Sequence, residues 1–189
     1  AFRSSLSSAF DYLTAPETRT SVSYSQNLET FSGFLHLAAE IGGPNDPFEA
    51  AGYLERLLLD PQNNQNDRDA IVSWFCLAPE DALFVANIAL SYVERYKEEV
   101  LHNDAAITAN AGKLFGVYIA AFNKVREDVD FLMADSYFLS LSLMFEAYRL
   151  QPSWALLDIE RNPPMRSPKR LIAIINEEIL FAIVKKEIV

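Results

Sequence analysis

The sequence predicts an all-α protein of eight to nine helices, in which neighbouring helices pack mostly antiparallel. Apolar side chains recur every three or four residues from end to end, which is the spacing of an amphipathic helix. The chain has only six glycines, and its nine prolines fall mostly between these periodic stretches. Two architectures fit these helices: a compact multi-helix bundle, or a HEAT- or armadillo-like stack of helix pairs. No repeat motif decides between them.

The N-terminal region is predicted to begin with two helices. The first carries apolar residues from Phe2 to Leu13 and ends before Pro16, and the Ser- and Thr-rich residues 15–26 are predicted as a loop. The second spans residues 28–38 and is closed by Gly42-Gly43-Pro44, because glycine favours a helix end.

Residues 46–49 carry a helix start signal. Asp46 would cap the free amides, Pro47 suits the first helical position, and Glu49 would complete a capping box. We therefore expect a third helix from this point to about Leu59, ahead of Pro61.

The middle of the chain predicts three further helices. Residues 62–66 form a polar loop, and Asp67 would cap a short helix through Cys76. Acidic residues at Pro79-Glu80-Asp81 favour the start of a long helix, and Asp104 would start another, from 105 to about 126. The expected inner stripe of the helix that starts at Pro79 is Leu83, Ala86, Ala89, Leu90, Val93, Tyr96 and Val100.

The C-terminal region predicts a helix over 130–150, a short turn over 153–159 and a terminal helix over 167–189. The apolar run 138–145 leaves little room for a polar face. That helix is therefore either central in the fold or covered by a partner or an apolar ligand.

Length and charge limit the classes of function. A chain of 189 residues suits one domain, residues 1–189, and a start at Ala1 instead of Met fits an excised piece of a longer protein. The net charge of −10 argues against nucleic-acid binding, because phosphates would be repelled. No apolar stretch is long enough to span a membrane.

The sequence contains no familiar catalytic, cofactor or metal motif. Glu99-Val100-Leu101-His102 places Glu and His one helical turn apart, as in half of a di-iron site, but the other half is missing, and His36 is expected to be a half-buried, satisfied imidazole. The stretch 60–69 lacks the central glycine of a calcium loop. Paired acids such as Asp128 and Asp130 leave an enzyme with unrecognised carboxylates as an alternative.

A basic, proline-rich segment over 161–170 is the predicted partner-binding loop. Its cations, on an otherwise acidic protein, would attract an acidic partner protein, and Ser167-Pro168 resembles a proline-directed phosphorylation site. The alternative is that these cations pair with the protein's own acidic helices. The cations are Arg161, Arg166, Lys169 and Arg170.

These observations favour a non-enzymatic protein–protein interaction or scaffold module, which binds through a helical groove or the basic loop. The alternatives are a helical binder of an apolar lipid or pigment, and a carboxylate enzyme. Cys76, the only cysteine, lies in an apolar run and is predicted to be buried. The single cysteine and the lack of a predicted signal peptide together favour a reducing cytoplasmic or nuclear setting.

If the basic loop binds the partner, the triple variant R166E/K169E/R170E should lose partner binding and keep its stability, because exposed charges contribute little to folding. Pull-down measures the first and thermal unfolding the second. Unchanged partners would remove the basic-loop hypothesis.

Overall fold

The all-α class is confirmed. The computed structural model describes residues 1–102 and 104–125, and these contain eight α-helices, one 3₁₀ turn and no strand. The predicted elements beyond residue 125, including the 161–170 loop, the apolar run 138–145 and the Asp128/Asp130 pair, lie outside the described residues. The elements are α1 (Phe2–Thr14), α2 (Pro16–Arg19), α3 (Tyr24–Gly42), η1 (Gly43–Asn45), α4 (Ala50–Leu59), α5 (Gln65–Phe75), α6 (Pro79–Arg95), α7 (Lys97–Leu101) and α8 (Ala105–Val125).

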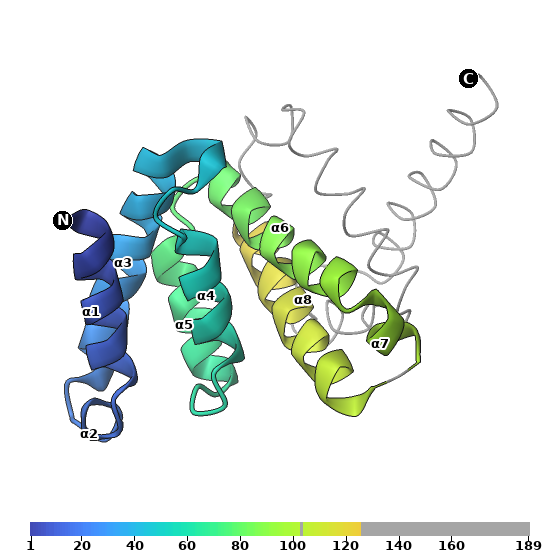
Figure 1. Ribbon diagram of the computed structural model, residues 1–189, viewed down its shortest axis with the longest axis horizontal. Helices are drawn as coiled ribbons and strands as arrows, with labels where there is room; N and C mark the ends of the chain where they lie inside the picture. Colours follow the sequence, from blue (N-terminus) through green and yellow to red (C-terminus); the bar gives the residue numbers. More distant parts are fainter. Residues whose placement is uncertain (103, 126–189) are drawn as a thin grey trace.

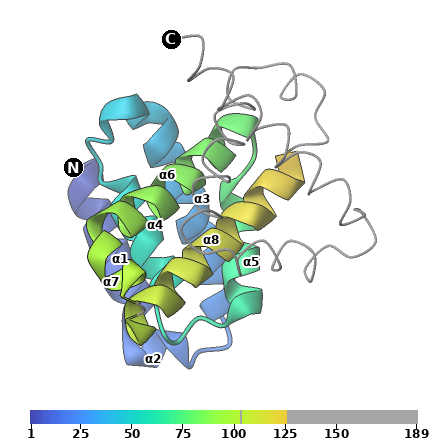
Figure 2. The ribbon, with the colours of Figure 1, turned by 90° about the vertical axis from the view of Figure 1, so that its right-hand side faces the viewer.

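The long helices lie in three neighbouring pairs (Figure 1). α1 packs on α3, α4 and α5 lie in the middle, and α6 packs on α8 on the other side. Each long helix runs in roughly the opposite direction to the long helix before it, as the short connections predict (Figure 1). Seen from the α6–α8 side, α6 and α8 cross in front of α4 and α5 (Figure 2). The choice between a bundle and a HEAT-like stack stays a prediction.

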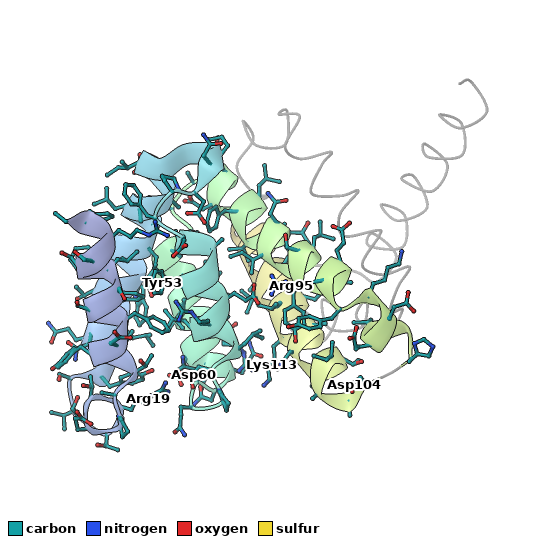
Figure 3. The ribbon with its side chains drawn as sticks, in the orientation of Figure 1. Arg19, Tyr53, Asp60, Arg95, Asp104 and Lys113 are labelled. Carbon is teal, nitrogen blue, oxygen red and sulfur yellow. The ribbon has the colours of Figure 1, made fainter. Side chains whose placement is uncertain are left out.

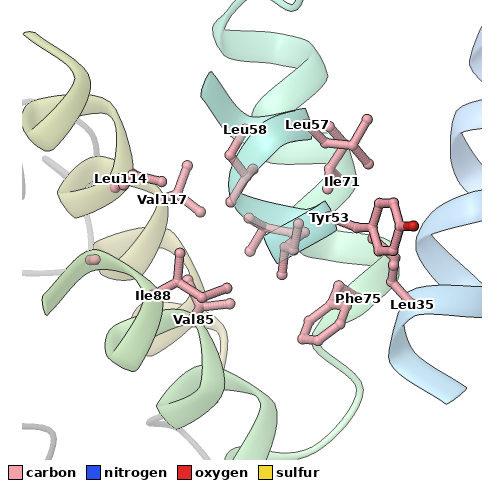
Figure 4. Packing of buried hydrophobic residues seen from close by; sticks show 14 of the residues in the cluster. Leu35, Tyr53, Leu57, Leu58, Ile71, Phe75, Val85, Ile88, Leu114 and Val117 are labelled. Atoms are coloured by element: carbon pink, nitrogen blue, oxygen red, sulfur yellow. The ribbon is translucent and has the colours of Figure 1, made fainter. Parts of the chain in front are cut away.

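α4 supplies the centre of the core. Its buried residues follow the helical spacing i, i+3, i+4, i+7 and i+8, from Ala50 to Leu58. Leu54, Leu57 and Leu58 are each 0% exposed. Figure 4 shows α4 between α3 on one side and α6 and α8 on the other, so one short helix is covered from both flanks.

Two arginines join the polar edges of α4 to its neighbours. The Arg56 guanidinium lies 4.4 Å from the ring centre of Phe10 on α1 and 4.6 Å from that of Tyr53, so it fills the space between two aromatic faces. Arg95 of α6 donates to both carboxylate oxygens of Glu55, at 3.1 and 3.3 Å. α4 is therefore fixed by polar contacts as well as by its leucines.

The predicted start of the third helix is wrong by three residues. Asp46 does accept two backbone amides, but they belong to Ala50 and Ala51, at 2.8 and 3.0 Å. Pro47 and Glu49 precede the helix in a turn where both Asp46 and Glu49 have positive φ. This turn folds back over Gly42, where an added Cβ would lie 2.8 Å from Pro47 Cδ. Packing of the turn on the end of α3 therefore delays the helix.

Other boundaries also differ from the sequence prediction. The predicted loop 15–26 contains α2 and the first turn of α3. Asn64 caps α5, while Asp67 serves from the third position of a capping box, with reciprocal hydrogen bonds of 3.0 and 2.9 Å. Asp104 caps α8 as predicted and accepts from Ile107 N at 3.0 Å.

The predicted long helix from Pro79 to Val100 is divided into α6 and α7 at Tyr96, whose φ of −115° leaves the helical range. At this break the ring centres of Tyr96 and Tyr92 lie 4.8 Å apart. Of the expected inner stripe, the structure buries Ala86, Ala89, Val93 and Val100. Leu83, Leu90 and Tyr96 are only half-buried. The inward face of α6 also includes Val85, Ile88 and Tyr92.

The covered position of α4 predicts a large effect of truncating it. Leu54→Ala should lower the free energy of unfolding by about 3 kcal/mol, because a cavity would form that neighbours on both flanks cannot close. Leu77→Ala, at a leucine that is 68% exposed, should change it by less than about 0.5 kcal/mol. Urea unfolding measures both, and equal losses would contradict the description of the core.

Candidate functional site

An open groove of about 610 Å³ lies between the C-terminal half of α3 and the N-terminal half of α6. We call it the α3–α6 groove. One wall comes from α3 and η1, and the other from α6 and the two residues before it. Its lining residues are His36, Ala39, Glu40, Gly43, Pro44, Leu77, Ala78, Glu80, Asp81, Leu83, Phe84 and Asn87.

Asp81 fixes the geometry where the two walls meet. Its Oδ2 accepts the backbone N–H groups of Leu77 and Ala78, both at 2.8 Å, and so closes the first turn of α6. The same oxygen lies 3.2 Å from His36 Nε2 of α3. One carboxylate therefore caps α6 and ties it to α3.

His36 is half-buried and satisfied, as its apolar neighbours predict. Its side chain is 17% exposed, and its ring meets the edge of Phe75 at 5.8 Å between ring centres. The imidazole is thus held between a carboxylate and an aromatic ring. This arrangement positions the groove wall, and among the residues that the structure describes no Ser, Thr, Cys, Lys or Tyr lines the groove beside His36.

The mouth of the groove combines an exposed apolar side chain with acidic ones. Leu77 is 68% exposed, although it lies directly beside the buried Cys76. Glu40 of α3 and Glu80 of α6 are also exposed, and neither forms an ion pair within residues 1–102 and 104–125. No Lys or Arg of the described part of the chain lines the groove. The described residues of the site therefore offer apolar contact area together with negative charge that none of them compensates.

A second polar cluster ties α2 and α3 to the loop between α4 and α5 (Figure 3). Arg19 forms an ion pair with Asp60 and donates from Nε to Thr14 O at 2.8 Å. Tyr24 donates to Asn63 Oδ1 at 2.8 Å, and Asn63 in turn donates to Leu57 O at 2.9 Å. These side chains bind one another or the backbone of neighbouring elements, so the cluster has a structural role.

Three pKa values in this cluster are shifted, and that of Arg19 is raised, mainly by its hydrogen bond to Asp60. Burial raises the pKa of Asp60, but hydrogen bonds from Arg19 and from the Gln62 N–H, with the charge of Arg19, outweigh it and leave the pKa lowered. Burial raises the pKa of Tyr24. Asp60 does not line the α3–α6 groove, and its lowered pKa follows from its pairing with Arg19.

His102 and the acidic residues of the 60–69 stretch have structural or solvent-exposed positions. His102 is 79% exposed, and its Nδ1 lies 2.7 Å from Glu98 O at the end of α7, which fits the expected solvated helix end. Asp60 and Asp67 of the calcium-like stretch bind Arg19 and the start of α5. Within the described part of the chain, no group of three or more His, Cys, Asp or Glu side chains could hold a metal ion.

The predicted partner-binding residues and the α3–α6 groove involve different parts of the chain. Arg161, Arg166, Ser167, Lys169 and Arg170 lie outside the described residues. The sequence predicts a helical groove without placing it on α3 and α6, although it identifies Pro79-Glu80-Asp81 as a helix start and His36 as half-buried. Nothing in the sequence connects His36 with Asp81, which lies 45 residues away.

Comparison with known proteins gave no match: no family model matches the chain, and neither a curated protein nor a solved structure is significantly similar. Within the residues that the structure describes, no helix is both long enough and apolar enough to cross a membrane. The geometry of the site is therefore the basis for a functional proposal.

The lowered pKa of Asp60 predicts how stability depends on pH. A carboxylate with a depressed pKa stabilises the fold above its unfolded value, near 3.8, and loses this effect as the pH falls through the folded value. Asp60→Asn should therefore lower the free energy of unfolding at pH 7 by about 1–2 kcal/mol, with the difference shrinking below pH 4. Urea unfolding across this range measures it, with Asp11→Asn, at an exposed acid, as the control. A difference that is constant with pH would contradict the ion pair.

Proposed function

We propose that this protein is a non-enzymatic interaction module that binds a segment of a partner protein in the α3–α6 groove. The observation that carries the proposal is the open groove itself, with the exposed Leu77 at its mouth. An apolar side chain in this position gains from being covered, and burying a leucine contributes about 1.5–3 kcal/mol.

The shape of the groove favours a protein partner over a small apolar ligand. A pocket for a lipid or pigment buries most of the ligand surface, whereas this groove is partly open to solvent. Because the two walls are formed by different helices, a peptide segment could lie between them and contact both, as in helix-in-groove recognition.

The chemistry of the groove favours binding over catalysis. Its one imidazole is held by Asp81, and the carboxylate with a lowered pKa belongs to the Arg19–Asp60 pair. An enzyme that uses carboxylates would require a concave site with a perturbed acid in it. A cytoplasmic or nuclear setting belongs to the same proposal, supported by Cys76, the one cysteine of the sequence, which is fully buried.

The test compares Leu77→Asp with Val22→Asp, a matched change at an apolar residue that is fully exposed and outside the groove. Leu77→Asp should weaken binding of the partner at least about tenfold, because apolar burial is lost and a charge is placed in the contact. Quantitative co-purification from the native source, followed by mass spectrometry, measures the recovered partner.

Thermal unfolding of both variants controls for folding, because both positions are exposed and neither change should lower the melting temperature appreciably. Recovery of the same partners by Leu77→Asp and Val22→Asp would refute the groove as the binding surface.

A further inference from the structure

We infer that the α3–α6 groove recognises a peptide segment in which an arginine or lysine stands beside an apolar anchor residue. The inference rests on the proposed function and adds the chemistry of the partner. It depends on the combination of an apolar mouth and, on both walls, carboxylates that pair with no cation among the described residues.

The apolar anchor is specified by the lining. Leu77 lies at the mouth, and Pro44, Leu83 and Phe84 add apolar surface from both walls. Phe84 and Leu83 are half-buried, so part of each side chain stays available to a ligand. An aliphatic or aromatic side chain would bury these groups together with itself, which supplies binding energy without directional requirements.

The basic side chain is specified by charge. Glu40 stands on one wall and Glu80 on the other, and no cation among the described residues pairs with either one. The negative end of the α3 dipole lies close to Glu40, two residues before the helix ends, and adds to the attraction for a cation. A guanidinium or ammonium group in the groove would be attracted from both walls.

Asp81 and His36, the other titratable groups of the groove, do not cancel this field. The Asp81 carboxylate is engaged by two backbone amides and by His36, so it contributes mainly to the structure of the wall. An acidic segment or a nucleic acid would meet Glu40 and Glu80 without compensation. The same groove would therefore disfavour these partners.

The experiment uses a random peptide library displayed on phage, selected on the immobilised full chain and, in parallel, on the Leu77→Asp variant. We expect peptides that are enriched on the wild type and depleted on the variant to carry Arg or Lys beside an apolar residue. The strongest peptide is then synthesised, and its affinity is measured by fluorescence polarisation at low and high salt.

The double variant E40K/E80K should bind the synthetic peptide about tenfold more weakly, since two favourable charges become repulsive. Its control is E29K/E94K, which makes the same charge change on the same two helices at exposed positions outside the groove. Affinity for the wild type should fall as salt rises, because exposed charges are screened.

The outcomes separate the two claims. Peptides that require Leu77 but carry no basic residue, or that bind E40K/E80K as well as the wild type, would overturn this inference and leave the interaction site in place. If no peptide depends on Leu77, including the case in which a second copy or residues 161–170 already cover the groove, the proposed function fails as well.

Discussion

Burial of α4 on both flanks is the constraint on which the described fold depends. A ten-residue helix is too short to be stable alone in water, so α4 exists because Leu54, Leu57 and Leu58 are covered by the helices around it. Those helices in turn share α4 as their common contact. Arg56 and Arg95 add polar contacts at its edges, which fix how α1 and α6 lie against it.

The α3–α6 groove is a consequence of this arrangement. α3 and α6 lie on opposite flanks of the α4–α5 pair, and they meet through the Asp81–His36 contact near one end. Beyond that contact the two helices are not covered by each other, which leaves Leu77, Glu40 and Glu80 exposed. The core uses its polar groups for helix caps and contacts between helices, whereas the groove has exposed apolar surface and carboxylates that form no ion pair with any described residue.

Single carboxylates in this protein cap helices, and one of them also contacts a second element. The packing around such a cap explains why the helix start at residues 46–49 was predicted wrongly. Asp46 accepts amides from Ala50 and Ala51, four and five residues ahead, because the turn between them folds onto Gly42. Asp81 caps α6 and also contacts α3. A sequence signal identifies such an acid as a cap, but the packed neighbours decide which amides it accepts.

From the amino-acid sequence alone, the helical class and the order of the long helices through residue 125 could be predicted, since these follow from apolar spacing, prolines and caps within each segment. The predicted boundaries were wrong at α3 and α4, where Tyr24 contacts Asn63 and the turn before α4 packs on Gly42, and the break at Tyr96 was missed. The contact of His36 with Asp81, and the position of Glu40 and Glu80 in one groove, follow from tertiary packing. Those pairs are separated by 40 residues or more, and their contact depends on how α3 and α6 pack around α4.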